Sequence, residues 1–282
     1  MKRIKILSLL LTATMLIMSC AKVPITGRRQ ARLIPSSQIN QLSVQQYGQF
    51  LQQNPPMRNT NEVQMVREVG NRLVRAVEVY YKNNGLQDQL AQFKWEFNVV
   101  QDPNVNAFCM PGGKVVIYTG ILPVTQDRDG LAVVMGHEIA HALAHHGNER
   151  MSQSLGVQGA MTLIDAALAV NTAQSENAQQ AQQRQQASQY IMAAAGIGAQ
   201  VGILLPFSRK HESEADRIGL ILMAIAGYDV NAAAPFWQRM QAQGGQAPPE
   251  FLSTHPHPET RADNLRKWAV EAQQYGQKYS IN

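Results

Sequence analysis

The feature that most constrains the fold of this chain is the stretch from Val133 to Gly147, which reads VVMGHEIAHALAHHG. Its Val, Met, Ile, Leu and Ala residues suit a buried helix, yet four histidines and one glutamate lie among them. Buried ionisable groups are costly unless they are paired or bind a metal. The fold must therefore bring partners to these side chains.

The spacing of the first two histidines predicts a metal site. His137 and His141 are four residues apart, so on a helix they lie one turn apart on the same face. Both imidazoles can then reach one zinc ion at about 2.0–2.1 Å, and Glu138 can act on water bound there. Asp127 or Asp129 can cap the helix start, and Gly147 can end it. The alternative is a helix whose histidines are surface groups or satisfied core groups.

A third protein ligand must come from another part of the chain. The longer metzincin motif needs a glycine and a histidine where this chain has Ala144 and Gly147, so that class is excluded. His145 and His146 are expected either to be exposed or to pack behind the ligands.

The candidate third ligand lies in the segment 208–219, SRKHESEADRIG. Glu212 and Asp216 are again four residues apart, and two histidines with one glutamate form an open catalytic zinc site. Asp216 can orient a ligand histidine through its ring N–H. Spacing alone does not choose between Glu212 and Glu214, and the segment also reads as an ordinary charged surface helix.

The N-terminus has the pattern of a targeting signal. Basic residues precede the apolar run ILSLLLTATMLIMS, which is followed by Cys20. Residues 17–20 resemble the lipobox of bacterial lipoproteins, which predicts a signal peptide over 1–19 and lipid on Cys20. Residues 20–35 are expected as a tether, in which Arg28 contacts anionic lipid or is simply solvated. Because Ala21 and not aspartate follows Cys20, the outer membrane is favoured over the inner.

Composition argues against a nucleic-acid partner and against an internal disulfide. The chain has 282 residues, 45% of them apolar, a formal net charge of +5 and two cysteines. The positive charge is concentrated before Cys20, so no nucleic-acid partner is expected. With Cys20 lipidated, Cys109 has no partner for a disulfide and is expected to be a small buried residue without a catalytic role.

The rest of the chain predicts an α+β domain over 36–282. The alternation in FKWEFNVV predicts a half-buried strand over 93–100, and KVVIY predicts a second at 114–118. Helices are expected over 36–53, from Thr60 onward, and over 129–146, 148–170, 178–205, 208–226, 230–243 and 259–275. The Gln/Ala-rich stretch 171–205 is expected to be a helical insertion that can cover the cleft. Its apolar end approaches the length of a membrane span, but Ala, Gly and Gln200 favour an interior helix.

Four motifs together carry a resemblance to a known family. The motifs NAFCMPGG, HEIAHALAHHG, SRKHESEADRIG and STHPHPETR follow one another in this order along the chain. Together they resemble the zinc metallopeptidases of the HtpX and CAAX prenyl endopeptidase kind. The resemblance covers about Val63 to Arg266 and is closest to the periplasmic lipoprotein branch. It implies a mainly helical gluzincin-type domain, one zinc ion per chain, and Glu212 as the third ligand with Asp216 as its companion.

The resemblance also implies roles for two further segments. Asn106, Ala107 and Phe108 belong to an edge strand that borders the active-site cleft and pairs with the substrate backbone. His255 lies near the zinc, where it stabilises the oxyanion or occupies the fourth metal position, and His257 is the second choice for either task. Arg261 is expected to support the site.

The function expected from these observations is zinc-dependent endopeptidase activity at the periplasmic face of the cell envelope. Its substrates are expected to be misfolded or misassembled envelope polypeptides, including outer-membrane proteins. The alternatives are a gated protease that acts mainly as a chaperone or assembly factor, and a structural zinc module without turnover.

Overall fold

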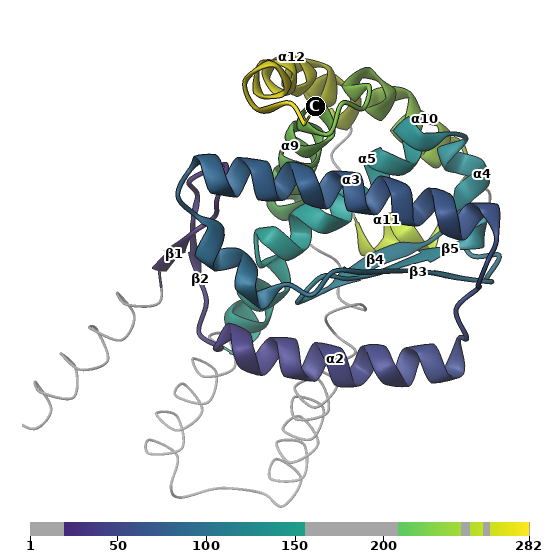
Figure 1. Ribbon diagram of the computed structural model, residues 1–282, viewed down its shortest axis with the longest axis horizontal. Coiled ribbons are helices and arrows are strands. Elements are labelled where there is room, and N and C mark those ends of the chain that lie inside the picture. Colours follow the sequence, from purple (N-terminus) through teal and green to yellow (C-terminus); the bar gives the residue numbers. More distant parts are fainter. Residues whose placement is uncertain (1–19, 156–207, 244–248, 256–259, 282) are drawn as a thin grey trace, which may run out of the picture.

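The computed structural model describes residues 20–155, 208–243, 249–255 and 260–281. Helices dominate, and a small sheet lies between them (Figure 1). The strands are β1 (Cys20–Lys22), β2 (Arg29–Ala31), β3 (Glu96–Val100), β4 (Ala107–Met110) and β5 (Lys114–Tyr118). The longer helices are α2 (Ser36–Gln53), α3 (Asn61–Asn83), α5 (Arg128–Leu143), α9 (Arg209–Ile225), α10 (Ala233–Ala242) and α12 (Arg261–Tyr279). The short helices are η1 (Gln87–Gln92), η2 (Thr119–Ile121), α4 (Leu122–Thr125), η3 (Val230–Ala232) and α11 (Glu250–Thr254).

The central sheet has the strand order β3-β5-β4, so β4 is an edge strand. β3 runs parallel to β5, and β4 runs antiparallel to it. Figure 1 shows α3 on one side of the sheet and α2 on the other. The alternation of side chains follows from this arrangement. Val115 and Ile117 face the main core, whereas Val116 joins Tyr47 and Phe108 in a second cluster under α2.

α3, the longest helix in the described part of the chain, begins where a threonine supplies its cap. The hydroxyl of Thr60 accepts a hydrogen bond from the backbone N–H of Val63. Beyond the cap, apolar residues at helical spacing line the face that packs on the core. Val66, Leu73 and Val77 on this face are fully buried.

Two glycines set the distance between α5 and α9. A methyl group added at Gly219 would lie 3.0 Å from the backbone of both Gly136 and His137. No larger residue fits at this crossing without displacing a helix. The close approach places the first turns of α9 beside His137 and His141.

The predicted α+β class is confirmed, with differences in the boundaries of the elements. The strand expected over 93–100 begins only at Glu96, because Phe93 and Trp95 stack on each other before it. The helix expected over 129–146 ends at Leu143, because His145 adopts a left-handed backbone with φ 52°. Residues 146–155 then form a new helical segment.

Other differences concern the C-terminal part. α11 was not expected, and α12 extends to Tyr279, beyond the expected end. A 3-10 turn precedes α10 in the region expected to be one helix over 230–243. Most of the expected helix 148–170, and all of the helix 178–205 and the Gln/Ala-rich insertion, lie outside the described residues.

The segment 20–35 differs from the tether that its sequence predicted. β1 pairs with β2 in an antiparallel hairpin, with Ala21 opposite Gln30. Arg28 is not solvated: its side chain is 14% exposed and forms ion pairs with Glu149 and Glu214. No local pattern indicates these two partners, because they lie more than a hundred residues away along the chain. Lipid on Cys20 stays a prediction.

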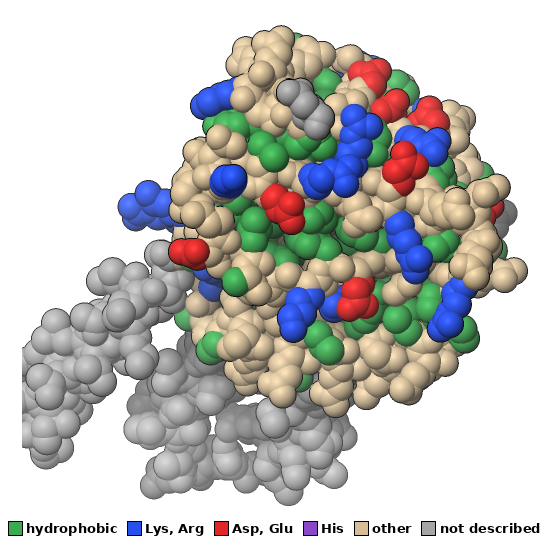
Figure 2. Space-filling model, in the orientation of Figure 1, with side chains coloured by type: hydrophobic (Ala, Val, Ile, Leu, Met, Phe, Trp, Pro, Cys, Tyr) green, Lys and Arg blue, Asp and Glu red, His purple; other side chains and the backbone are tan. Residues whose placement is uncertain are grey.

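The described surface of the domain has mixed charge on the face seen in Figure 2, where basic and acidic side chains are interspersed. Within the described ranges, no helix combines the length and apolar character that a bilayer span requires. The described histidines are buried or half-buried, and none is visible on this face.

Candidate metal centre

The two histidines of α5 lie side by side in the interior. His137 and His141 are both nearly inaccessible to solvent. Their Nε2 atoms are 3.0 Å apart, as the four-residue spacing predicts for side chains one turn apart on a helix. Asp127 is the cap of this helix, because its carboxylate accepts a hydrogen bond from the N–H of Gly130.

Glu212 approaches the two imidazoles from α9. Its Oε2 lies 3.3 Å from Nε2 of His137, and its Oε1 lies 3.3 Å from Nε2 of His141. Donor atoms bound to one tetrahedral zinc at 2.0–2.1 Å would be separated by about 3.3 Å. Glu214, the other candidate from spacing, faces away from this point and contacts His146 instead.

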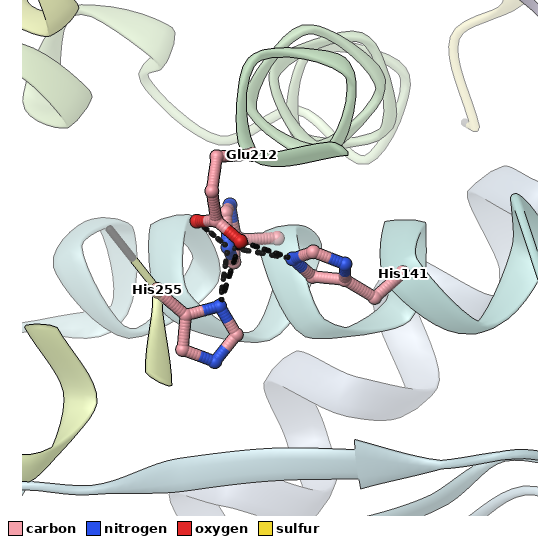
Figure 3. Close-up of side chains that lie close together, drawn as sticks. His141, Glu212 and His255 are labelled. Carbon is pink, nitrogen blue, oxygen red and sulfur yellow. Dashed lines mark hydrogen bonds and ion pairs between the residues drawn. The ribbon is translucent and has the colours of Figure 1, made fainter. Parts of the chain in front are cut away.

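His255 completes the group from the end of α11. Its Nδ1 lies 3.3 Å from Nε2 of His137 and 3.2 Å from Oε1 of Glu212. Figure 3 shows His141, Glu212 and His255 directed toward one another. The donor atoms of all four residues lie within 4.8 Å of one another, and all four residues are buried. His257, the alternative to His255, lies outside the described residues.

The chemistry of this donor set fits a zinc ion. Two imidazole nitrogens and one carboxylate are the protein ligands of a catalytic zinc site. Oε2 of Glu212 is fully buried and has no hydrogen-bond donor within the described part of the chain. A buried carboxylate oxygen without a donor is satisfied if it binds a cation.

Asp216 and Arg261 support His137 from behind. Oδ1 of Asp216 lies 2.9 Å from Nδ1 of His137, which leaves Nε2 directed toward the site. The guanidinium of Arg261 donates to the same oxygen over 2.5 Å, and its Cζ lies 3.2 Å from the centre of the Trp237 ring. Both residues lie beside the candidate ligands.

His146 lies behind His141, as Asp216 lies behind His137. The sequence alone predicts either an exposed His146 or one that packs behind the ligands. The left-handed turn at His145 directs the chain back, so that His146 is fully buried. Its Nδ1 lies 2.9 Å from Nδ1 of His141, and its Nε2 lies 2.9 Å from Oε2 of Glu214. Half-buried His145 instead lies beside Phe93.

Glu138 lies between the candidate metal ligands and the edge strand. Its Oε2 accepts a hydrogen bond from the backbone N–H of Cys109 over 3.0 Å. Its Oε1 has no hydrogen-bond donor among the described residues and lies 3.5 Å from Nε2 of His255. One carboxylate oxygen is thus anchored and the other faces the site.

The electrostatics of the group follow from burial and from the opposite charges inside it. Burial raises the pKa of Glu138 above its usual value. Burial opposes ionisation of Glu212 as well, but His255 and His137 outweigh it and hold the pKa of Glu212 well below its usual range. Burial lowers the pKa of His141, which favours the neutral imidazole that binds metals.

The pKa of the Cys109 thiol is raised well above its usual value by burial and by the nearby Glu138. The neutral thiol is therefore favoured. Cys109 was expected to be buried, but it is half-buried.

A groove runs along the edge strand and opens onto the site. Asn106, Ala107 and Phe108 line it, together with Glu138, His141 and His255. Ala107 and Phe108 belong to β4, and Asn106 precedes it. The three side chains are buried, and β4 is an edge strand, whose backbone can pair with an added strand. α2 forms the opposite wall through Ile39, Leu42, Ser43 and Gln46, a role that the sequence did not indicate.

Comparison with known proteins agrees with this geometry. The sequence model described as "Peptidase family M48" matches residues 64–269. The mitochondrial metalloendopeptidase OMA1 of Schizosaccharomyces pombe is 39% identical over 186 residues, which cover 65% of this chain and 49% of that protein. Human mitochondrial metalloendopeptidase OMA1 is 31% identical over 257 residues, covering 88% of this chain and 46% of that protein. The beta-barrel assembly-enhancing protease of Yersinia pestis is 30% identical over 185 residues, which cover 62% of this chain and 34% of that protein.

The chain therefore spans half or less of the length of these relatives. The matched region contains both α5 and α9, and it includes the residues of the candidate metal centre. The resemblance drawn from the four sequence motifs is confirmed: this chain belongs to peptidase family M48.

Proposed function

We propose that this chain is a zinc-dependent endopeptidase whose metal ligands are His137, His141 and Glu212. The observation that carries the proposal is the convergence of these three side chains, from two helices, at separations of 3.0 to 3.3 Å. Membership of the family and the adjacent Glu138, whose Oε1 faces the site, support hydrolysis over a purely structural metal site.

The residues of the chain have distinct tasks in this reaction. Zinc, when bound, polarises the peptide carbonyl and makes water more acidic. Glu138 accepts the proton of the attacking water through its free oxygen and later donates it to the leaving amine. The edge of β4 holds the substrate as an added strand, through the backbone groups that remain beside the N–H groups of Ala107 and Cys109, which are bonded to Asn106 and Glu138. Asp216 keeps the proton of His137 on Nδ1, so that Nε2 stays available as a ligand.

The position of His255 supports a second, gated form of this function. Its Nδ1 is as close to His137 and Glu212 as the three proposed ligands are to one another. In this arrangement His255 would be a fourth ligand of the metal and would exclude water from it. When it moves away, the same imidazole can donate to the oxyanion. A protease held closed in this way fits the alternative function as a chaperone or assembly factor.

The substitution His255→Ala separates these two tasks. Release of a block raises the rate of cleavage of an unfolded polypeptide, whereas loss of an oxyanion donor lowers it about 10²-fold or more. The assay needs the zinc content of both forms to be equal, and a chelator must abolish the cleavage. Cleavage that persists in the chelator would contradict the proposed metal mechanism.

We further propose that the chain works at the periplasmic face of the cell envelope, anchored through lipid on Cys20, with the outer membrane favoured. The lipobox-like residues 17–20 support the anchor. Similarity to the beta-barrel assembly-enhancing protease of Yersinia pestis supports misassembled outer-membrane proteins as substrates. The similarity to the mitochondrial OMA1 proteins leaves the type of substrate to experiment.

Two measurements test this setting. Metabolic labelling with a fatty acid shows whether the wild-type chain, but not Cys20→Ala, carries lipid. Comparing a deletion strain that carries Glu138→Gln with one that carries the wild type separates proteolysis from assembly. Full rescue by the inactive variant favours the assembly role, and failure to rescue favours proteolytic quality control.

A further inference from the structure

A chain of buried hydrogen bonds runs from His141 away from the metal centre. Nδ1 of His141 contacts Nδ1 of His146 over 2.9 Å, and Nε2 of His146 contacts Oε2 of Glu214 over 2.9 Å. His146 is fully buried and Glu214 nearly so. The mechanism described above does not use either residue.

With both imidazoles neutral and Glu214 ionised, these two contacts are compatible with one arrangement of protons. A carboxylate accepts and does not donate, so the proton of a neutral His146 lies on Nε2, toward Glu214. Nδ1 of His146 is then an acceptor, and it takes the N–H of His141 Nδ1. Nε2 of His141 is left without a proton, on the side of Glu212 and His137. Without the carboxylate, His146 could carry its proton on Nδ1 and force that of His141 onto Nε2, where it would exclude a metal.

The same carboxylate is held by the N-terminal segment. Nε of Arg28 donates to Oε2 of Glu214 over 2.6 Å, and the hydroxyl of Thr26 donates to its Oε1 over 2.5 Å. Arg28 also binds both oxygens of Glu149, so it joins α9 to the helical segment that carries His146. Both oxygens of Glu214 therefore accept hydrogen bonds, Oε1 from Thr26 and Oε2 from Arg28 and His146.

The arrangement parallels the support of the other ligand. His137 is bonded directly to Asp216, which is held by Arg261. His141 is linked to Glu214, which lies on the same helix as Asp216, but this link passes through the imidazole of His146. We propose that Glu214 acts through His146 as a positioning residue for His141, and that Arg28 makes the N-terminal segment part of the support of the metal centre. This inference rests on the proposed function, because it takes His141 to be a metal ligand.

The test is the zinc affinity of the full-length chain, measured by competition with a chromophoric chelator. The variants are His146→Asn, Glu214→Gln and the double variant. His146→Asn retains an acceptor for His141 but is too short to reach Glu214, so both single changes break the same link. Each should weaken zinc binding 10- to 100-fold, as loss of a hydrogen-bonded partner behind a ligand typically does. Because the two changes break one link, their effects should not add. The zinc affinity of the double variant should lie within about twofold of that of the single variant that binds zinc more weakly.

A matched control shows whether the loss of zinc affinity is specific to Glu214 or follows from the loss of any ion pair made by α9. Arg217 of this helix binds both oxygens of Glu271 on α12. Glu271→Gln removes a carboxylate that pairs with α9 but touches neither histidine, so it should leave the zinc affinity within about twofold of the wild type. Arg28→Gln should weaken zinc binding in the wild-type background but not in the Glu214→Gln background.

A spectroscopic readout and the choice of variant keep the outcome decisive. The visible spectrum of the Co²⁺-substituted chain reports the geometry at the metal, and it should shift in His146→Asn and not in Glu271→Gln. His146→Asn keeps every formal charge of the cluster, so it tests the inference even if Glu214→Gln does not fold. Wild-type affinity and an unchanged spectrum in a folded His146→Asn would overturn the inference. Failure of the wild-type chain to bind zinc would instead overturn the proposed function.

Discussion

The backbone N–H of Cys109 donates a hydrogen bond to Oε2 of Glu138 over 3.0 Å. This bond joins the edge strand β4 to the helix that carries both candidate histidine ligands. It fixes one oxygen of the proposed base and leaves the other directed toward the site. The strand that would hold the substrate therefore also positions the group that would activate water.

Replacing Glu138 by glutamine should abolish cleavage without loss of zinc. The amide oxygen can still accept the hydrogen bond from Cys109, so the local structure is kept, but an amide cannot accept the proton of water. General base catalysis is typically worth about 10²- to 10⁴-fold, and the rate should fall by at least that factor. Glu68→Gln, which alters an exposed ion pair with Arg128, is the control. Normal cleavage by a metal-loaded Glu138→Gln variant would show that another group is the base.

The crossing of α5 and α9 should be sensitive to one added methyl group. Gly219→Ala would place a carbon 3.0 Å from the backbone of Gly136 and His137, so the helices must separate. We expect about 1–3 kcal/mol of lost stability from overpacking, and weaker zinc binding because Glu212 moves with α9. Thermal unfolding and zinc competition measure the two effects.

Gly48→Ala is the matched control for this crossing. A methyl group at Gly48 of α2 meets nothing within 4 Å. Its effect is the gain in helix propensity, up to about 1 kcal/mol, with no change in zinc affinity. Equal zinc affinities in Gly219→Ala and the wild type would contradict the importance of this close approach.

The support of His137 predicts a loss of affinity in Asp216→Asn. The amide cannot carry the negative charge that Arg261 and the ring N–H of His137 both contact. We expect zinc binding to weaken about 10- to 100-fold. Asp263→Asn, which alters an exposed pair with Arg266 on α12, should have no such effect. A chelator competition assay that ranks the two variants equally would argue against this task for Asp216.

Acid should destabilise the metal-free chain in part through Glu149. Burial opposes ionisation of Glu149, but its bonds to His211 and Arg28 lower its pKa to about 2 in the folded state, from an ordinary value of 4.5. Its folded pKa is depressed, so the stabilisation is present above pH 4.5 and is lost as the pH falls toward 2. The difference in pKa corresponds to at most about 3 kcal/mol.

Urea unfolding at a series of pH values measures this contribution. The free energy of unfolding of the wild type should fall between pH 4.5 and 2 more steeply than that of Glu149→Gln. Above pH 5 the two curves should run parallel. Identical slopes throughout the acid range would show that Glu149 does not have a depressed pKa.

The local part of the site could be predicted from the sequence, because it depends on helix geometry alone. His137, Glu138 and His141 are fixed by a spacing within one helix, and Asp127 caps that helix as expected. Glu212 could not be separated from Glu214 by spacing. In the structure the two residues lie on opposite sides of α9. Glu212 faces the candidate histidine ligands, and Glu214 faces His146.

The remaining parts depend on contacts between distant segments. The left-handed turn at His145 is uncommon for a residue other than glycine, and it is what returns His146 to the interior. Arg28 read as a solvated residue of a tether, yet its partners Glu149 and Glu214 are more than a hundred positions away. No local pattern marks such contacts. The predicted fold class is nevertheless correct, because the alternation of apolar residues in strands and their spacing in helices are local properties of the sequence.

The central claim is that His137, His141 and Glu212 bind one zinc ion. The most direct measurement is the zinc content of the full-length chain by plasma mass spectrometry, after exchange against a weak chelator. We predict one zinc per chain in the wild type and in Glu271→Gln, and almost none in Glu212→Ala. Stoichiometric zinc in a folded Glu212→Ala variant, or a folded wild type that retains none, would contradict the account.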